Sequence, residues 1–371
     1  SFIVKKNSQN TDQKFKIKMK IQNKKIGINN PTFFIADIAA NHDGNLNKAI
    51  DLIHLCAENG ADAAKFQHFK ADTIVSDLGF KKLKSKKSHQ STWKKNVYEV
   101  YKDASINLEW TKKLKKACDE CGIVFFTSPY DLDLVDYVNK YVPAYKIGSG
   151  DITYLEIIEK IASKKKPVIL ATGASTLKDV DRAIKIILKK NSDICLMQCN
   201  TNYTAEKKNF NYINLNVLKT FAKKYPKIIL GLSDHTIGHA TVLGAIALGA
   251  RMVEKHFTDN NNREGPDHKF SMNPKSWKEM IERSRELENS LGSGEKIIEK
   301  NENETVILQR RAIRTKTKLL KGLKLKSADL ICLRPCPSNG ILPFELKKIV
   351  GKTLKKDIEK GDLIKWKDLK L

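Results

Sequence analysis

Long runs of uncharged apolar residues are absent from this chain of 371 residues. A membrane-spanning helix needs roughly 18 or more such residues, and the longest apolar stretches here are interrupted by Lys or Asp. Residues 1–25 also lack the apolar segment and the small-residue cleavage site of a secretory signal. These absences predict a cytoplasmic protein with no membrane partner.

The cysteine pattern does not fit a disulfide framework. The seven cysteines are an odd number in a chain too large to depend on disulfides, so we expect reduced thiols. Cys118 and Cys121 have CxxC spacing, but they close a helix expected to begin near Leu108, and no second such pair completes a zinc site. Cys332 and Cys336 lie in an expected loop. For both pairs, a zinc or redox role is the less favoured interpretation.

Acidic residues are few relative to basic ones: 42 Asp and Glu against 68 Lys and Arg, a net charge of +26. Such a charge can indicate nucleic-acid binding, because clustered cations neutralise phosphates. Here the lysines are spread over nearly every expected helix, without an aromatic stacking series or a recognition helix. We therefore expect no nucleic-acid partner, and only a modest attraction of anionic substrates.

Nucleotide-binding glycine motifs are also missing, since neither GxGxxG nor a Walker sequence occurs. Between residue 33 and about residue 290, short apolar runs alternate with helical patterns such as 46–59 and 240–248. Eight such units predict an α/β fold, a (β/α)8 TIM barrel, rather than an open doubly wound sheet. The expected strands are 33–38, 61–66, 123–127, 144–147, 168–171, 194–198, 228–232 and 252–255.

The pattern divides the chain into four parts. A Lys-rich extension (1–30) precedes the catalytic barrel (31–290). A linker (291–309) follows, because Gly292 and Gly294 break the last helix and the next segment is highly charged. The remainder (310–371) has short apolar pieces separated by Gly and Pro, which is typical of a small β-rich module.

Two lysines stand at expected strand ends, where a barrel carries its chemistry. Lys65 and Lys146 would each point an ammonium group into the barrel mouth, and such a group must be paired or meet an anion. The pattern therefore predicts a phosphate or carboxylate ligand, with Ser149 and Gly150 helping to bind it. The alternative is a structural ion pair with Asp37 or Asp151.

Two histidines also lie at expected strand ends, in Ser-Asp-His ending at 235 and Glu-Lys-His ending at 256. Neutral imidazoles would suit a divalent transition metal with open positions for substrate. The alternative for each is a core histidine. Asp234 is a candidate to orient His235, and Asp267, in a Pro-Asp turn after the last strand, would supply a carboxylate unless it forms only an ordinary turn.

Several segments in order resemble the sialic acid synthase (N-acetylneuraminate synthase) family. They are 34–44 (FIADIAANHDG), 60–67 (GADAAKFQ), 142–151 (VPAYKIGSGD), 230–236 (LGLSDHT) and 254–258 (EKHFT), and the resemblance covers about residues 32–371. It implies condensation of phosphoenolpyruvate with the open-chain aldehyde of an N-acetylated amino sugar, such as N-acetylmannosamine. The products would be a sialic acid resembling N-acetylneuraminate and inorganic phosphate.

The resemblance also implies roles for particular residues. His235 and His256 would bind a divalent metal, Mn²⁺ before Mg²⁺ or Co²⁺, which polarises the aldehyde. Lys65 and Lys146 would anchor phosphoenolpyruvate, and Asp37 would be a catalytic carboxylate. The further substrate contacts implied are Gln67, Thr127, Ser149, Asp151 and Ser233, with Tyr203 and the catalytic Asp267 facing the sugar.

The C-terminal module resembles the SAF domain, a β-clip or antifreeze-like fold. Arg334 matches an arginine that reaches the active site of the other subunit, which implies a homodimer with a domain-swapped SAF module.

The chain departs from the family where Asp37 and Asp151 replace the usual glutamates and Ala171 replaces a common serine. Three alternatives stay open: a synthase of legionaminic- or pseudaminic-type acids, a non-catalytic basic barrel that binds polyanions, and a degenerate synthase kept for assembly or regulation.

Overall fold

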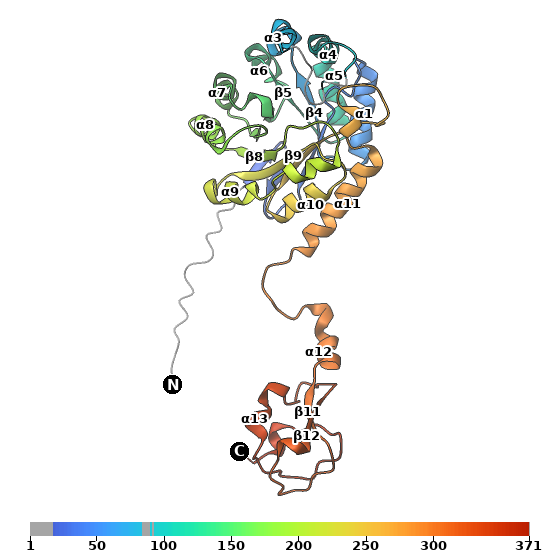
Figure 1. The fold of residues 1–371 in the computed structure, drawn as a ribbon, viewed down its shortest axis with the longest axis vertical. Coiled ribbons are helices and arrows are strands. Elements are labelled where there is room, and N and C mark those ends of the chain that lie inside the picture. The colour runs from blue at the N-terminus through green and yellow to red at the C-terminus, as the bar shows by residue number, and fades with distance from the viewer. Residues whose placement is uncertain (1–17, 84–89, 91–92, 371) are drawn as a thin grey trace. The chain divides into compact units, whose positions relative to one another are not determined.

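The computed structural model describes residues 18–83, 90 and 93–370, and the chain divides into two compact units after Gly292. The first unit contains a closed barrel of eight strands, each parallel to its neighbours (Figure 1). Strand β10 pairs with β3 and closes the ring. The barrel strands are β3 (Phe33–Asp37), β4 (Ala63–His68), β5 (Val124–Pro129), β6 (Tyr145–Ile147), β7 (Val168–Ala171), β8 (Ile194–Cys199), β9 (Ile229–Asp234) and β10 (Met252–His256).

All eight expected barrel strands are confirmed, with ends within two residues of those expected. Nearly every strand residue is buried, because one face packs in the barrel interior and the other packs against helices. Such strands appear in the sequence as continuous apolar runs, and this is the signal that located them.

Helices follow the strands and cover the outside of the barrel. In α8 the buried residues recur at helical spacing, Val180, Ala183, Ile184 and Ile187, so that one stripe faces the strands. The covering helices are α1 (Leu46–Glu58), α5 (Trp110–Glu120), α6 (Leu132–Val138), α7 (Leu155–Ser163), α8 (Leu177–Leu188), α9 (Val217–Lys224), α10 (Ala240–Ala247) and α11 (Pro274–Ser290).

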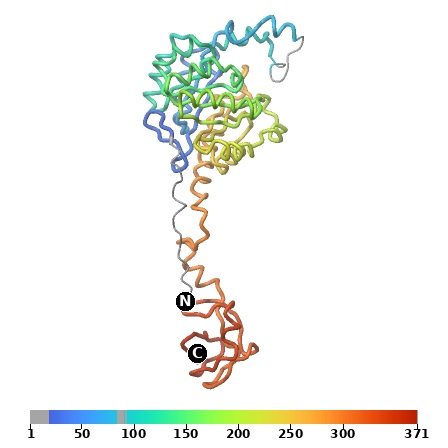
Figure 2. The backbone as a smooth tube through the Cα atoms, turned by 90° about the vertical axis from the view of Figure 1, so that its left-hand side faces the viewer, coloured from blue at the N-terminus to red at the C-terminus, as the bar shows by residue number. Residues whose placement is uncertain are grey.

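The connection after β4 is much longer than the others. It contains α2 (Ala71–Ile74), α3 (Asp77–Lys82) and α4 (Val97–Ala104) before the covering helix α5. Figure 2 shows this light-blue segment standing out from one side of the barrel. The sequence pattern did not predict it as a separate feature.

Part of the Lys-rich extension expected at 1–30 forms a short hairpin. Strands β1 (Lys18–Ile21) and β2 (Lys24–Gly27) pair antiparallel, and Met19, Ile21 and Ile26 belong to the barrel's hydrophobic core. The apolar residues alternate with lysines, as in any strand with one buried face. The high lysine content obscured that alternation in the sequence, and residues 1–17 lie outside the described part of the chain.

The second unit begins with η5 (Lys300–Glu302) and α12 (Asn303–Gln309), so the linker expected at 291–309 is helical in its second half. Strands β11 (Ala312–Thr315) and β12 (Leu330–Leu333) pair antiparallel, and α13 (Leu346–Ile349) follows. Most other pairing is by isolated bridges such as Leu319 with Ile358. The module has its own core, which includes Ile313, Leu354 and Ile364.

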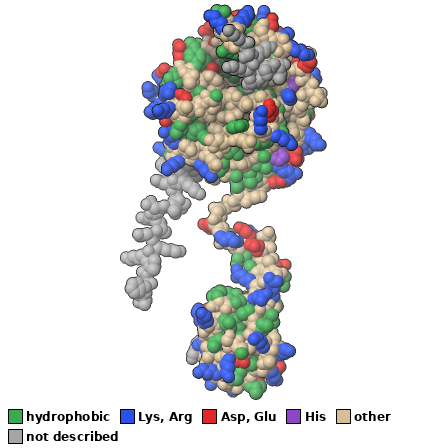
Figure 3. Space-filling model, in the orientation of Figure 1, with side chains coloured by type: hydrophobic (Ala, Val, Ile, Leu, Met, Phe, Trp, Pro, Cys, Tyr) green, Lys and Arg blue, Asp and Glu red, His purple; other side chains and the backbone are tan. Residues whose placement is uncertain are grey.

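Basic side chains are dispersed over the visible face of each unit (Figure 3). Within the described part of the chain, none of the helices has both the length and the apolar character that crossing a bilayer requires.

Candidate active site

A pocket of about 440 Å³ lies at the carboxyl ends of the barrel strands. Its lining comes from β3, β4, β6, β9 and β10 and from the connections after β3, β4, β5, β6, β8, β9 and β10. The structure brings together eleven of the thirteen residues expected for the site, namely Asp37, Lys65, Gln67, Lys146, Ser149, Asp151, Tyr203, Ser233, His235, His256 and Asp267.

Two buried lysines and two buried carboxylates form an ion-pair cluster in this pocket. Lys65 Nζ lies 2.6 Å from Asp37 Oδ2 and 3.7 Å from Glu254 Oε2. Lys146 Nζ lies 3.1 Å from Glu254 Oε1, which also accepts a hydrogen bond of 3.0 Å from Ser233. The alternative pairing of Lys65 with Asp37 is therefore present, whereas Lys146 pairs with Glu254 and not with Asp151.

The cluster keeps Glu254 and Lys65 charged although both side chains are buried. Burial by itself would raise the pKa of Glu254, but Lys146 and Lys65 outweigh it and lower that pKa to about 2. Burial by itself would lower the pKa of Lys65, but Asp37 and Glu254 outweigh it and raise that pKa. For Asp37, burial prevails over Lys65, so its pKa is raised. Asp37 is thus the carboxylate of the cluster that takes up a proton most readily.

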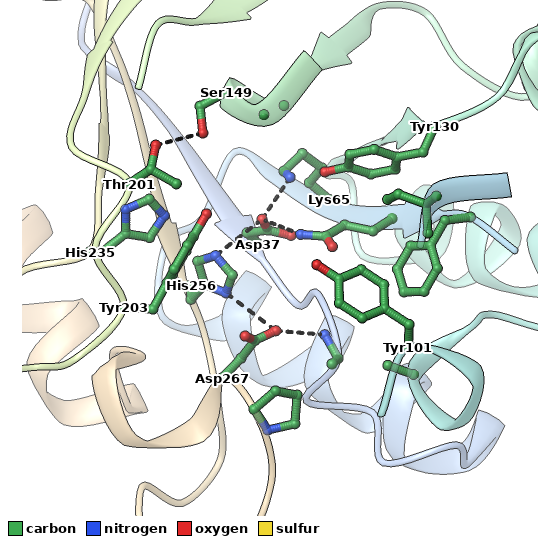
Figure 4. A pocket seen from close by; sticks show the side chains of 18 of the residues that line it. Asp37, Lys65, Tyr101, Tyr130, Ser149, Thr201, Tyr203, His235, His256 and Asp267 are labelled. Atoms are coloured by element: carbon green, nitrogen blue, oxygen red, sulfur yellow. Dashed lines mark hydrogen bonds and ion pairs between the residues drawn. The ribbon is translucent and has the colours of Figure 1, made fainter. Parts of the chain in front are cut away.

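The two histidine rings lie beside this cluster, with centroids 5.4 Å apart. His235 Nδ1 donates a hydrogen bond of 2.9 Å to the Asn200 carbonyl, which leaves Nε2 as the nitrogen with a free lone pair. His256 Nε2 is 3.6 Å from Asp37 Oδ2, and its Nδ1 is 3.8 Å from Asp267 Oδ2 (Figure 4). That Nδ1 is buried without a hydrogen-bond partner.

The histidines fit a divalent metal in chemistry and in protonation. Burial lowers the pKa of His235 to about 3 and that of His256 to about 4, so both imidazoles are neutral at pH 7. Neutral imidazole with one nitrogen free or unpartnered is the form that ligates metals. Among the described residues, no group of three or more His, Cys, Asp or Glu side chains is placed to hold a metal. Two imidazoles would therefore leave most coordination positions to water and substrate.

Asp267 lies on the loop after β10 and faces the pocket. Its Oδ2 accepts a hydrogen bond of 3.1 Å from the backbone N–H of Ala40, in the loop after β3. The Ser271 hydroxyl donates to the Asp267 carbonyl at 2.6 Å, and Asn41 donates both to Ser271 and to the Phe257 carbonyl. These bonds tie two loops together and fix the Asp267 carboxylate near His256.

Asp234 has a different role from the one expected. Its carboxylate pairs with Lys255 and accepts hydrogen bonds from the hydroxyls of Thr236 and Thr241. Neighbouring residues of a strand point to opposite faces, so Asp234 points away from the pocket that His235 faces. The Asn200 carbonyl orients His235 instead.

The remaining lining residues are polar or aromatic. Ser149 is hydrogen bonded to Thr201 at 2.9 Å, and Gln67 Nε2 donates to Asp37 Oδ2 at 3.3 Å. Burial raises the pKa of Asp151 to about 6. The Tyr203 ring packs on His235, with centroids 4.3 Å apart.

Two expected residues are not brought to the pocket. Phe66 stands between Lys65 and Gln67, which both face the pocket, so Phe66 faces the helices. Thr127 is opposite Phe66 in the β4–β5 register and therefore faces the helices as well. Its hydroxyl donates to the Phe66 carbonyl and lies 2.8 Å from His68 Nδ1. Arg334 is in the second unit, where its Nε donates to the Gln309 carbonyl at 2.6 Å.

Among the lining residues with a carboxyl or hydroxyl group, four were missed: Glu254, Thr201, Tyr101 and Tyr130. The sequence carried a signal for Glu254, because it stands two residues before His256 and a strand repeats every two residues. No comparable pattern marks the tyrosines, which lie in α4 and immediately after β5.

Comparison with known proteins agrees with this arrangement. The NeuB family model matches residues 52–296 and the SAF domain model matches residues 310–370. An uncharacterized protein of Methanocaldococcus jannaschii is 37% identical, with 95% of this chain and 98% of that protein covered.

An N,N'-diacetyllegionaminic acid synthase of Campylobacter jejuni is 34% identical over 90% of this chain and 99% of its own length. The crystal structure of an N-acetylneuraminic acid synthetase from Leptospira borgpetersenii, in complex with citrate, superposes with a TM-score of 0.68 at 29% identity, covering 78% of this chain and 95% of that one. The chain belongs to the NeuB family and carries a SAF domain C-terminal to its barrel.

Proposed function

We propose that this enzyme condenses phosphoenolpyruvate with the aldehyde of an N-acetylated amino sugar and releases phosphate. The observation that carries the proposal is a single pocket holding two buried lysines beside two neutral histidines. Relatives named N,N'-diacetyllegionaminic acid synthase, pseudaminic acid synthase and N-acetylneuraminate-9-phosphate synthase support the same class of reaction.

Lys65 and Lys146 bind the phosphate and carboxylate groups of phosphoenolpyruvate. Both ammonium groups are almost fully buried, so their charges are poorly screened by water and act strongly on an anion in the pocket. Asp37 and Glu254 balance the two lysines, and the incoming anion competes with these carboxylates. The hydroxyl of Ser149 is a further donor.

His235 and His256 hold the divalent metal, for which Mn²⁺ is the first candidate and Mg²⁺ or Co²⁺ the next. When bound, the metal supplies Lewis-acid polarisation of the sugar aldehyde. Asp267, fixed by the Ala40 N–H, faces the sugar hydroxyls together with Tyr203.

The reaction then balances as follows. The C3 carbon of phosphoenolpyruvate forms a bond to the aldehyde carbon, and the aldehyde oxygen takes up a proton to become a hydroxyl group. Water adds at C2 while Asp37 Oδ2 accepts one of its two protons. The C2–O bond to phosphate breaks, phosphate leaves with the electron pair, and the C2 hydroxyl releases the second proton as C2 becomes the ketone of the product. Burial raises the pKa of Asp37, as suits a base, and the aspartate still lies 3.6 Å from His256 despite being shorter than glutamate.

We also propose that the protein assembles as a homodimer. A homodimer in which each SAF module serves the other subunit would bring Arg334 to the partner's pocket. Arg334 is exposed in its own unit, as such a role requires.

The test measures phosphate release from phosphoenolpyruvate with a panel of N-acetylated hexosamines and bacillosamine-type sugars, with Mn²⁺ and with chelator. Release should require both the metal and one sugar. Lys146→Met should lower kcat/KM for phosphoenolpyruvate by about 10- to 150-fold, the usual contribution of a hydrogen bond to a charged group. The control Lys112→Met alters an exposed lysine of α5 outside the pocket and should have no effect. No release with any sugar, or equal rates for both variants, would refute the proposal.

A further inference from the structure

A buried histidine joins the loop after β10 to the loop after β3. His268 Nε2 lies 2.9 Å from Asp43 Oδ1, in the loop after β3, and its Nδ1 lies 2.7 Å from the Thr258 hydroxyl, just beyond β10. A carboxylate only accepts hydrogen bonds, so the Nε2–H of His268 donates to Asp43. Both ring nitrogens are therefore used to hold the two loops together.

Asp43 is fixed from its other side as well. Its Oδ2 pairs with the ammonium group of Lys48, in α1. Burial by itself would raise the pKa of Asp43, but hydrogen bonds from His268 and Lys48 outweigh it and lower that pKa. The carboxylate therefore stays charged at neutral pH and remains an acceptor for the histidine.

The loop after β10 is folded closely around His268. A Cβ at Gly265 would lie 2.7 Å from His268 Cδ2, so only glycine lets the backbone pass this near the ring. Asn261 Nδ2 donates hydrogen bonds to the carbonyls of His268, at 2.9 Å, and Ser271, at 2.7 Å. The place of the histidine thus determines the path of the whole loop.

The neighbours of His268 in the sequence contact the reacting groups. Asp267, immediately before it, faces the pocket with Oδ2 3.8 Å from His256 Nδ1 (Figure 4). Phe270, at the end of η4 (His268–Phe270), packs on the His256 ring with centroids 4.9 Å apart. His268 itself is not among the described residues that line the pocket. It can therefore act on a substrate only through its neighbours.

We propose that Asp43 and His268 are positioning residues, whose hydrogen bond sets the Asp267 carboxylate for contact with the acceptor sugar. This rests on the proposed function, in which Asp267 faces that sugar. Asp267 Oδ2 accepts its bond from the Ala40 N–H across the same two loops, so this bond forms only while the loops keep their spacing. A displacement of about 1 Å caused by a distant change can cost about 10²-fold in rate.

The experiment breaks the bond from its less buried end, since the Asp43 side chain is 33% exposed whereas that of His268 is fully buried. It uses the full chain with Mn²⁺, phosphoenolpyruvate and the sugar of the panel above that gives the highest rate. Asp43→Ala should lower kcat/KM for the sugar by about 10- to 100-fold, the usual effect of removing an orienting partner. KM for phosphoenolpyruvate should not change, because Lys65 and Lys146 bind it. Asp43→Asn keeps an oxygen that can accept from His268 and should retain most of the activity.

Two further variants test whether Asp43 acts through Asp267. Lys48→Met removes the ion pair with Asp43 but leaves the bond to His268, so it is the matched control and should keep kcat/KM for the sugar. In an Asp267→Ala background, Asp43→Ala should cause no further loss, because the carboxylate that it positions is already gone.

A second pair of variants covers the case in which urea unfolding shows that Asp43→Ala does not fold. The side-chain amide of glutamine reaches as far as Nε2 of a histidine, whereas that of asparagine reaches only as far as Nδ1. His268→Gln should therefore keep the bond to Asp43 and retain more activity toward the sugar than His268→Asn.

The outcomes distinguish this inference from the proposed function. Unchanged kcat/KM in Asp43→Ala, the same loss in Lys48→Met, or the same loss with and without the Asp267 carboxylate would overturn the positioning role, although the condensation itself stands. So would a rise in KM for phosphoenolpyruvate that matches the loss for the sugar, or equal activity of the two His268 variants. Absence of phosphate release by the original chain with every sugar would overturn the proposed function, and this inference with it.

Discussion

Replacing Asp234 with asparagine should strongly destabilise the barrel, because it leaves a buried lysine without its counter-charge. Asp234 and Lys255 lie opposite each other in the β9–β10 register, and each side chain is only 1% exposed. Lys255 has one other hydrogen-bond acceptor, the Thr236 carbonyl at 2.6 Å. Because the ammonium group of Lys255 is buried, water cannot replace the ion pair that it loses in this variant.

The expected magnitude follows from the burial. Removing one partner of a buried ion pair costs about 3–5 kcal/mol, whereas replacing both with neutral groups of similar size is often close to neutral. Asp234→Asn and Lys255→Met should each lower the free energy of unfolding by about that amount, and the double variant should lose about 2 kcal/mol or less. The resulting coupling free energy of about 4 kcal/mol or more would be large for a neighbouring pair, for which about 0.5–3 kcal/mol is usual.

The assay is urea unfolding of the barrel, followed by tryptophan fluorescence, because Trp277 is fully buried in the barrel core. Lys116→Met is the matched control, since Lys116 and Glu120 form an exposed pair on α5 with side chains 77% and 57% exposed. It should change the unfolding free energy by about 0.5 kcal/mol or less. A loss below about 1 kcal/mol for Asp234→Asn, or a double variant equal to the sum of the singles, would refute the reasoning.

Three further predictions concern the same unit. Burial lowers the pKa of His68 to about 3. The neutral ring therefore stabilises the fold fully above about pH 6.5, and this contribution is lost as the pH falls toward about 3. His68→Asn should reduce the slope of the unfolding free energy against pH by about 1.4 kcal/mol per pH unit in that window. Glu254→Gln should lower the free energy of unfolding by about 3–5 kcal/mol, because Lys146 loses its ion-pair partner. Added phosphate should raise the thermal unfolding temperature of this variant more than that of the original chain. Gly148→Ala places a Cβ 2.7 Å from the Tyr130 hydroxyl, so it should lower kcat/KM, and Tyr130→Phe in the same chain should restore part of the loss. Unchanged activity of Gly148→Ala would contradict the close contact.

The barrel could be predicted because its strands are buried on both faces and therefore appear as apolar runs. Their polar ends then identified most of the pocket. Asp234 was expected to orient His235 and Thr127 to contact substrate, but side chains alternate between the two faces of a strand. A residue next to an inward-facing one faces the helices, and this alternation places both residues outside the pocket. Glu254 would have been found by the same rule. The lining residues of the connection after β4, such as Phe69 and Tyr101, lie beyond such reasoning, since they meet through tertiary packing that leaves no pattern in the sequence.

Because side chains alternate between the two faces of a strand, neighbouring residues at the strand ends have different roles. In both Ser-Asp-His and Glu-Lys-His, the outer two residues face the pocket while the middle one joins the buried ion pair. Asp234 and Lys255 thus hold β9 and β10 in register, and that register sets the spacing of His235 and His256. The pocket residues of β9 and β10 thus stand on rigid strands, whereas lining residues such as Val100 and Tyr101 belong to an inserted segment.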